Sequence, residues 1–166
     1  MIIRSGDGEV DIALLENKGL VEFHNEKLDK GFNVGDIFLG RVKRLVPGLN
    51  AAFVDVGYEK DAFLHYHDLG PKMDSLQKYI TEGITGKRNS GLLQDFKIEP
   101  DINKNGKIDQ VLKPNRYLLV QIAKEPISTK GPRLTCEISI AGRFLVLVPF
   151  NDKISVSQKI KSRDER

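Results

Sequence analysis

The sequence contains a single cysteine, Cys136, and no long run of apolar residues. One cysteine cannot form a disulfide within the chain and cannot supply a zinc site built from several cysteines. No segment approaches the roughly eighteen consecutive apolar residues of a membrane-spanning helix, and the first ten residues lack the apolar stretch of an export signal. We therefore expect a cytoplasmic protein with no membrane span.

A strong excess of charge of either sign is also missing. The chain has 26 Lys and Arg against 23 Asp and Glu, a formal net charge of +3. Such a balance excludes binding to nucleic acid through bulk charge, so any such role must depend on local clusters of basic residues. With 166 residues, of which 40% are hydrophobic and 30% charged, the chain suits a globular protein with one substantial core or two small ones.

Alternating apolar and polar residues are the main pattern present. Near the N-terminus, "EVDIALLEN" and "GLVEFHNEK" alternate and are joined through Asn17, Lys18 and Gly19, which predicts a β-hairpin within residues 2–25. Gly40, inside a later strand, predicts a bulge or a sharp coil. Five further strand-like segments separated by turns predict a mainly β fold with a small closed barrel of the OB type, which leaves no exposed strand edge. These segments are 36–46, 51–57, 60–65, 116–124 and 133–142.

Residues 70–112 interrupt this β pattern. The stretch "PKMDSLQKYI" predicts one short helix with Met73, Leu76 and Ile80 on one side. The remainder is rich in Gly, Asn and charged residues, which is typical of loops. We expect a long, partly helical and partly mobile insertion on the surface of the barrel domain.

Two phenylalanines occupy positions that strand alternation places outside the barrel. In "AAFVDVG" and "DAFLHYH", the small and aliphatic residues share one face, so Phe53 and Phe63 lie on the other, with His65 beside Phe63. Either another part of the protein, such as the hairpin or the insertion, covers both rings, or the rings form a binding surface.

Basic residues near both rings favour a binding surface. Aromatic residues interleaved with Lys and Arg on a barrel face form a stacking platform for single-stranded nucleic acid, and each stacked base contributes about 1–3 kcal/mol. Phosphate contacts add affinity that depends on salt but not on sequence. The neighbouring basic residues are Arg41, Lys43, Arg44, Lys124, Lys130 and Arg133.

Three stretches of the sequence resemble a known family. "GDIFLGRVKRLVPGLNAAFVDVGYEKDAFLH", "LLVQIAKEPISTKGPRLT" and "ISVSQKI" closely resemble the N-terminal part of the ribonuclease E/G family of bacterial endoribonucleases. The resemblance covers nearly the whole chain apart from residues 70–112. It implies an S-one-type OB domain over 35–140, preceded at 1–34 by the first piece of a ribonuclease-H-like subdomain with no catalytic role. It also implies that residues 141–166 begin a segment that senses the 5′-monophosphate of RNA.

The resemblance also implies a set of RNA-contacting residues. Phe53, Phe63 and Lys124 match the contact residues of the family, and related S-one modules use a histidine and an arginine that match His65 and Arg133. Together with two basic residues of the first barrel strand, the predicted RNA-binding set is Phe53, Phe63, Lys124, His65, Arg133, Arg41 and Lys43. We predict no catalytic and no metal-binding residue.

Family members cut RNA in rRNA maturation and mRNA turnover. The resemblance implies that magnesium is held by aspartates of a nuclease domain, and that many members form homo-oligomers through a Cys-Pro-x-Cys zinc link. Both features belong to family segments beyond this sequence. We therefore expect the chain alone to bind single-stranded RNA without cutting it and without a cofactor. The strand edges of its hairpin should be open to pairing with neighbouring molecules.

Three alternatives remain at this point. The stretch "DINKNGKID" mimics the start of a calcium-binding EF-hand loop, but Leu112 occupies the twelfth position, where a carboxylate is required. A hydrolase site could be built from His65, His67, Asp55 and Asp68, although no nucleophile is evident. A stand-alone OB module could instead bind nucleic acid, oligosaccharide or protein with no associated nuclease.

Two isolated residues have plainer interpretations. His24 in the hairpin is expected to be a surface residue with no partner. Cys136 lies at an inward strand position, with Leu134 and Ile138 two residues to either side. Such a cysteine is expected to be a small core residue and not a reactive thiol.

Overall fold

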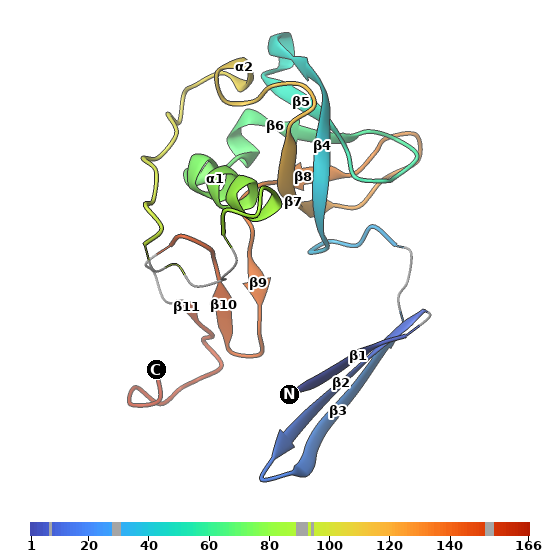
Figure 1. Ribbon diagram of the computed structural model, residues 1–166, viewed down its shortest axis with the longest axis vertical. Coiled ribbons are helices and arrows are strands. Elements are labelled where there is room, and N and C mark those ends of the chain that lie inside the picture. Colours follow the sequence, from blue (N-terminus) through green and yellow to red (C-terminus); the bar gives the residue numbers. More distant parts are fainter. Residues whose placement is uncertain (7, 28–30, 89–92, 94, 152–154) are drawn as a thin grey trace. The chain divides into compact units, whose positions relative to one another are not determined.

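The computed structural model describes residues 1–6, 8–27, 31–88, 93, 95–151 and 155–166, and Figure 1 shows its elements. The chain forms two compact units, Met1–Gly31 and Phe32–Arg166. Each unit is described by itself.

The first unit is a three-stranded antiparallel sheet in the order β1-β2-β3. β2 (Glu9–Glu16) and β3 (Gly19–Lys27) form the predicted hairpin, whose turn residues Asn17 and Lys18 have φ values of 51° and 66°. β1 (Ile2–Ser5), which the sequence pattern did not separate as a strand, pairs with β2. No described side chain of these strands is buried, so this sheet has no core of its own.

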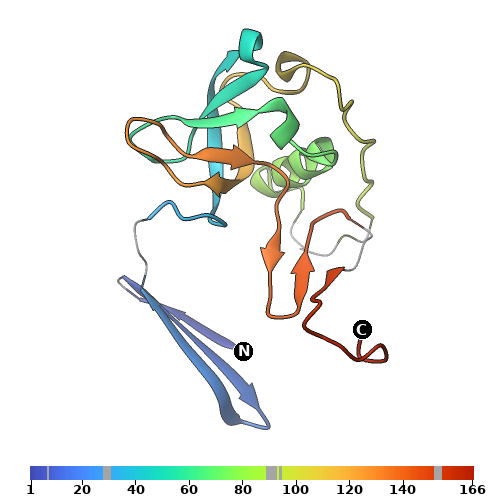
Figure 2. The ribbon, with the colours of Figure 1, turned by 180° about the vertical axis from the view of Figure 1, so that it is seen from behind.

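The second unit is built on a closed barrel with the strand order β4-β5-β6-β8-β7. All neighbouring strands are antiparallel except β6 and β8, which are parallel. Figure 2 shows the same strands from behind. The bounds are β4 Ile37–Val46, β5 Ala51–Asp55, β6 Ala62–His65, β7 Tyr117–Lys124 and β8 Arg133–Thr135. The predicted mainly β fold with a five-stranded OB-type barrel is confirmed.

The last barrel strand is shorter than the predicted segment 133–142, because β8 ends at Thr135. Leu134, Cys136 and Ile138 nevertheless alternate inward and are all buried. Three short strands, β9 (Ile140–Ala141), β10 (Leu145–Leu147) and β11 (Ser155–Val156), follow and form a separate small sheet in the order β11-β10-β9.

Gly40 has a different role from the one predicted. The irregularity in β4 lies between Val42 and Arg44, where Lys43 is the extra residue in the pairing with β5. Gly40 is buried, and a Cβ atom at this position would lie 2.6 Å from Cγ1 of Val54. Gly40 therefore allows the close packing of β4 against β5. The bulge itself lies at Lys43 and contains no glycine.

The insertion is partly helical, as predicted, but it contributes to the core, so the prediction that it lies on the surface was wrong. α1 (Met73–Ile84) buries Met73 and Leu76. The short helix α2 (Ile108–Val111) begins with the buried Ile108 and is followed by the buried Leu112. Hydrophobic burial of this kind fixes α1 against the barrel, as Figure 1 shows. The helical part is short compared with the long insertion that the sequence suggested.

Two hydrogen-bonded links join this insertion to the 3₁₀ turns η1 (Pro47–Leu49) and η2 (Tyr66–Asp68). Asn50 donates from Nδ2 to the carbonyl of Gly106 (3.1 Å) and accepts from the amide of Ile108 (2.7 Å). The Tyr66 hydroxyl donates to the carbonyl of Asn103 (2.5 Å). The stretch that resembles an EF-hand loop is therefore held against the barrel by its own backbone carbonyls.

No helix within the described ranges is long and apolar enough to cross a membrane.

Candidate nucleic-acid interface

Phe53 and Phe63 form an aromatic pair on the outside of the barrel. They are register partners on β5 and β6, with ring centroids 5.9 Å apart and an interplanar angle of 73°. Their strand neighbours Ala52, Val54, Ala62 and Leu64 are fully buried, so alternation turns both phenylalanines outward. Both rings are half-buried, partly by each other, which leaves part of each ring accessible.

Arg44 lies over the Phe53 ring, with Cζ 4.2 Å from the ring centroid. The two residues are register partners, because the bulge at Lys43 moves Arg44 to the outer face of β4. The arrangement is a cation–π contact, which also holds the guanidinium over the barrel face. Regular alternation from the buried Val42 would place Arg44 inside the barrel. The sequence pattern named Arg44 among the basic neighbours of the rings, but the predicted RNA-binding set did not include it. Its only sequence signal was its place in the basic group 41–44.

Register pairs extend this contact across all five barrel strands. Arg44 on β4 is opposite Phe53 on β5, Phe53 is opposite Phe63 on β6, and Phe63 pairs with Arg133 on β8. Arg133 is in turn opposite the exposed Lys124 on β7. We call these five residues the aromatic–basic row. It places two aromatic rings between cationic side chains on adjacent strands, an arrangement suited to base stacking with phosphate contacts at both ends.

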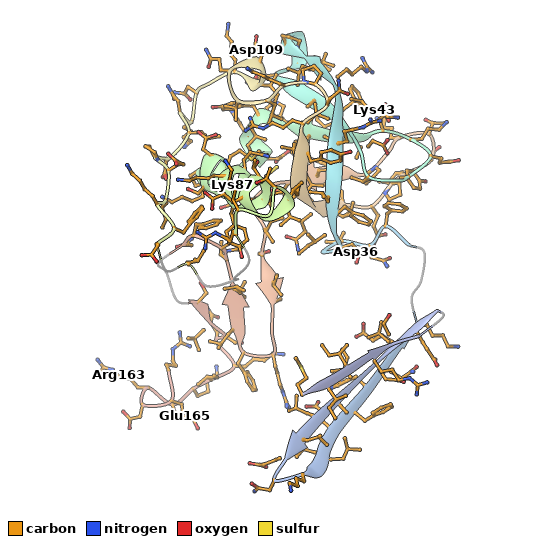
Figure 3. All side chains as sticks on the ribbon, viewed as in Figure 1. Asp36, Lys43, Lys87, Asp109, Arg163 and Glu165 are labelled. Carbon is orange, nitrogen blue, oxygen red and sulfur yellow. The ribbon has the colours of Figure 1, made fainter. Side chains whose placement is uncertain are left out.

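Two predicted cations are not part of this row. Lys43, labelled in Figure 3, forms ion pairs with Asp61 (2.8 Å) and Asp55 (3.9 Å). The hydrogen bond with Asp61 raises the pKa of the Lys43 ammonium above its ordinary value. Arg41 is exposed and is paired in register with Asp55 on β5 and Tyr117 on β7. The structure therefore separates these two residues from the aromatic pair that the sequence grouped with them.

His65 and Arg133 lie beside Phe63 with defined partners. His65 follows Phe63 on the same strand face, and its Nδ1 accepts a hydrogen bond from the amide of His67 (3.2 Å). The guanidinium of Arg133 donates to both carboxylate oxygens of Asp68, with the shortest distance, from Nη2 to Oδ2, at 2.9 Å.

The hydrolase alternative is not supported by these contacts. Asp68 is bonded to Arg133, and Asp55 accepts from the amide of Gly57 and pairs with Lys43. Within the described part of the chain, neither His65 nor His67 is bonded to either aspartate. The four residues therefore do not form an acid–base pair.

The calcium alternative also fails on geometry. Leu112, at the position that would need a bidentate carboxylate, is fully buried in the core. Among the residues that the structure describes, no group of three or more His, Cys, Asp or Glu side chains could hold a metal ion. These residues therefore do not fit the magnesium or zinc that the family resemblance implies.

Cys136 lies in the core and His24 lies on the surface. Burial raises the pKa of the Cys136 thiol to about 12, which fits the predicted core position. His24 lies on the surface as expected, but Nε2 is 2.9 Å from Oε1 of Glu22, so the prediction that it has no partner was wrong.

The closed five-stranded barrel with its outward aromatic pair places the second unit among OB-type barrels. No family model matches the chain. Curated proteins do: ribonuclease G of Haemophilus influenzae is 37% identical over 158 residues, which is 95% of this chain and 28% of that protein. Ribonuclease G of Escherichia coli K12 is 34% identical over 166 residues, 100% of this chain and 30% of that protein.

A third relative, ribonuclease E of Nostoc sp., is 37% identical over 134 residues, 80% of this chain and 16% of that protein. The chain belongs to the ribonuclease E/G family. It spans 30% or less of the length of these curated relatives.

Proposed function

We propose that the second unit binds single-stranded RNA along the aromatic–basic row, and that it holds RNA for a ribonuclease G-like endoribonuclease. The observation that carries this proposal is the alignment of Arg44, Phe53, Phe63, Arg133 and Lys124 as register partners on five adjacent strands. Its membership of the ribonuclease E/G family supports RNA as the ligand.

The aromatic–basic row has side chains for both the bases and the phosphates of an RNA strand. Unpaired bases stack on Phe53 and Phe63, and each stacked base contributes about 1–3 kcal/mol with little preference for sequence. Arg44, Arg133 and Lys124 neutralise phosphates, and His65, two residues after Phe63 on the same face of β6, adds a polar group beside the rings. We expect weak binding with a clear salt dependence, because much of the affinity comes from phosphate contacts.

Within the whole ribonuclease, we propose that RNA cleavage and the magnesium and zinc chemistry belong to other segments. The residues of this chain would bind and orient RNA. The aromatic pair would hold unpaired bases, and the basic ends of the row would hold the backbone. The proposed processes are rRNA processing and mRNA turnover in the cytoplasm.

Fluorescence anisotropy with a labelled oligouridine, measured at two salt concentrations, tests the proposal. Phe53→Ala and Phe63→Ala should each weaken binding by roughly 5- to 150-fold, which corresponds to the loss of about 1–3 kcal/mol of stacking. Phe23→Ala is the matched control, because Phe23 is an exposed strand phenylalanine of the first unit.

Loss of binding must be separated from loss of folding, because both rings are half-buried. Thermal unfolding of each variant provides this check. Equal affinity of Phe53→Ala, Phe63→Ala and the unsubstituted chain would remove the aromatic pair from the site. Binding to a protein or an oligosaccharide, with none to RNA at low salt, would favour the stand-alone OB module.

A further inference from the structure

Asp68 is fixed at the C-terminal end of η2 by its own backbone. Its carbonyl accepts hydrogen bonds from the Thr135 hydroxyl (3.0 Å) and from the amide of Cys136 (2.8 Å). Its position is therefore set by the segment that follows β8. The carboxylate projects from an anchored main chain.

The carboxylate of Asp68 accepts hydrogen bonds from one edge of the Arg133 guanidinium. Nε donates to Oδ2 (3.0 Å), and Nη2 donates to Oδ1 (3.2 Å) and Oδ2 (2.9 Å). A two-pronged contact of this kind fixes the plane of the guanidinium as well as its position. The side chain of Asp68 is 21% exposed and that of Arg133 is 45% exposed, so the carboxylate lies on the inner side of the pair.

The remaining edge of Arg133 is available to a ligand. Nη1 donates to no residue that the structure describes, and Arg133 lies between Phe63 and Lys124 in the aromatic–basic row. An acceptor oxygen beside the Phe63 ring would therefore meet a guanidinium whose orientation is already set. Phosphate oxygens are such acceptors, and a base stacked on Phe63 brings its phosphate into this region.

We propose that Asp68 is a positioning residue for RNA binding, which holds the guanidinium of Arg133 ready to contact a phosphate next to Phe63. This inference rests on the proposed RNA-binding function. A free arginine side chain must be immobilised when it binds, and a side chain that is already held avoids most of that cost. Asp68 thus improves affinity even though its own charge repels phosphate.

The charges alone predict that Asp68 weakens RNA binding, which is the opposite effect. Removing one negative charge beside a phosphate site should tighten binding if the main effect of Asp68 is repulsion. Positioning and repulsion therefore predict opposite signs for the same substitution, Asp68→Asn. Asparagine has nearly the same size and leaves the two backbone hydrogen bonds in place, but it is uncharged and has only one acceptor oxygen, so it cannot hold the guanidinium with two oxygens as the carboxylate does.

The experiment measures the affinity of Asp68→Asn for a labelled oligouridine over a range of salt concentrations. We expect binding weaker by about two- to tenfold, the loss that corresponds to immobilising one long side chain. The slope of log K against log salt should also fall, by up to about 0.7, if the Arg133 phosphate contact is lost. Asp68→Glu, which retains a carboxylate, should recover part of the affinity.

Two further variants make the result specific. Asp109→Asn removes the same charge from an exposed position of α2, labelled in Figure 3, and should leave the affinity unchanged. In an Arg133→Met background, Asp68→Asn should have no further effect, because the positioned group is absent.

Tighter binding by Asp68→Asn would overturn the proposal in favour of repulsion. An equal loss in both backgrounds with a lower melting temperature would show a structural role instead, and would also overturn it. If Phe53→Ala weakens binding but Asp68→Asn does not, the RNA site stands and only the role of Asp68 fails. If no aromatic variant changes the affinity, the proposed function itself fails.

Discussion

The two adjacent cations Lys43 and Arg44 have different surroundings, although both point out of the barrel. Lys43 is neutralised by Asp61 at 2.8 Å and Asp55 at 3.9 Å. Arg44 is stacked on Phe53, and among the described residues it has no acidic partner. A phosphate that approached Lys43 would have to compete with two carboxylates, whereas at Arg44 it would meet a cation beside a stacking ring.

Substitution of these two residues by methionine should therefore have unequal effects on RNA affinity. We expect Arg44→Met to weaken oligouridine binding several-fold and to reduce the salt slope by about 0.7, the value for one phosphate contact on a single strand. Lys43→Met should change both quantities less. Anisotropy titrations over a range of salt concentrations measure the difference. A larger loss for Lys43→Met would contradict the place given to Arg44 in the row.

Because Cys136 is buried, we expect its thiol to be unreactive in the folded protein. Its thiol pKa is raised to about 12 by burial, and the nearby Asp68 carboxylate acts in the same direction. The thiol should therefore react with a disulfide reagent at pH 8 only after the protein unfolds. Rapid reaction in the folded protein at this pH would show that Cys136 is not a core residue.

The raised pKa of Cys136 also determines how its contribution to the free energy of unfolding changes with pH. The folded-state pKa lies above that of an unfolded thiol, so the unfolded chain releases this proton first as the pH rises. The contribution is complete below the unfolded pKa of about 8.5 and is lost as the pH rises toward about 12. Thermal unfolding of the protein and of a Cys136→Ala variant should differ most in pH dependence within this range.

At the scale of elements, strand alternation predicted the barrel interior and the outward turn of Phe53 and Phe63. It did not predict the bulge at Lys43, because no glycine or proline marks it and a single extra residue reverses the faces of all residues after it. The register of Arg44 with Phe53 was therefore not predicted. The parallel pairing of β6 with β8 brings Phe63 next to Arg133, and a contact between residues so far apart in sequence cannot be read from local pattern.

The insertion shows a second limit of sequence patterns. Its Gly-, Asn- and charge-rich composition predicted a surface loop, yet Ile108 and Leu112 are fully buried. These two apolar residues lie among polar neighbours in the sequence, and hydrogen bonds to Asn50 and Tyr66 link the backbone before them to the barrel. Two core residues can thus lie in a segment whose composition is typical of loops, because the helix that begins at Ile108 and ends just before Leu112 has only four residues.

Leu112→Ala should consequently destabilise the barrel unit. We expect a loss of about 2–5 kcal/mol in the free energy of unfolding, as for other leucines removed from a packed core. Ile98→Ala is a suitable control in the same insertion, because Ile98 is 44% exposed and its removal should change stability by about 0.5 kcal/mol or less. Chemical denaturation of both variants measures the two values. Equal stabilities would mean that the insertion is not part of the core.

At the scale of the whole molecule, the two units differ in how they bury apolar surface. The barrel unit has a continuous core, whereas the sheet of the first unit exposes Ile2, Ile3, Leu20, Val21 and Phe23. Both edges of that sheet, β1 and β3, lack a partner strand within the described residues. The predicted ribonuclease-H-like character of this segment, and the 5′-sensing character of residues 141–166, remain predictions.

We propose that the first unit allows this chain to self-associate through its open strand edges. Sedimentation velocity should show a mean mass that rises with protein concentration. Substitution of Val21 and Phe23 by lysine should reduce this association, because charged residues on an edge strand oppose strand pairing. A strict monomer at all concentrations, with hairpin amides protected from exchange, would count against self-association.

The central claim is that single-stranded RNA lies across five adjacent barrel strands on the aromatic–basic row. NMR titration of the protein with oligouridine tests it most directly, because each residue reports its own contact. We predict that the resonances of Arg44, Phe53, Phe63, Arg133 and Lys124 shift together with one affinity, and that those of the exposed α2 residue Asp109 and the first-unit residue Phe23 do not. Shifts confined to other residues, or no shift at saturating RNA and low salt, would contradict this claim.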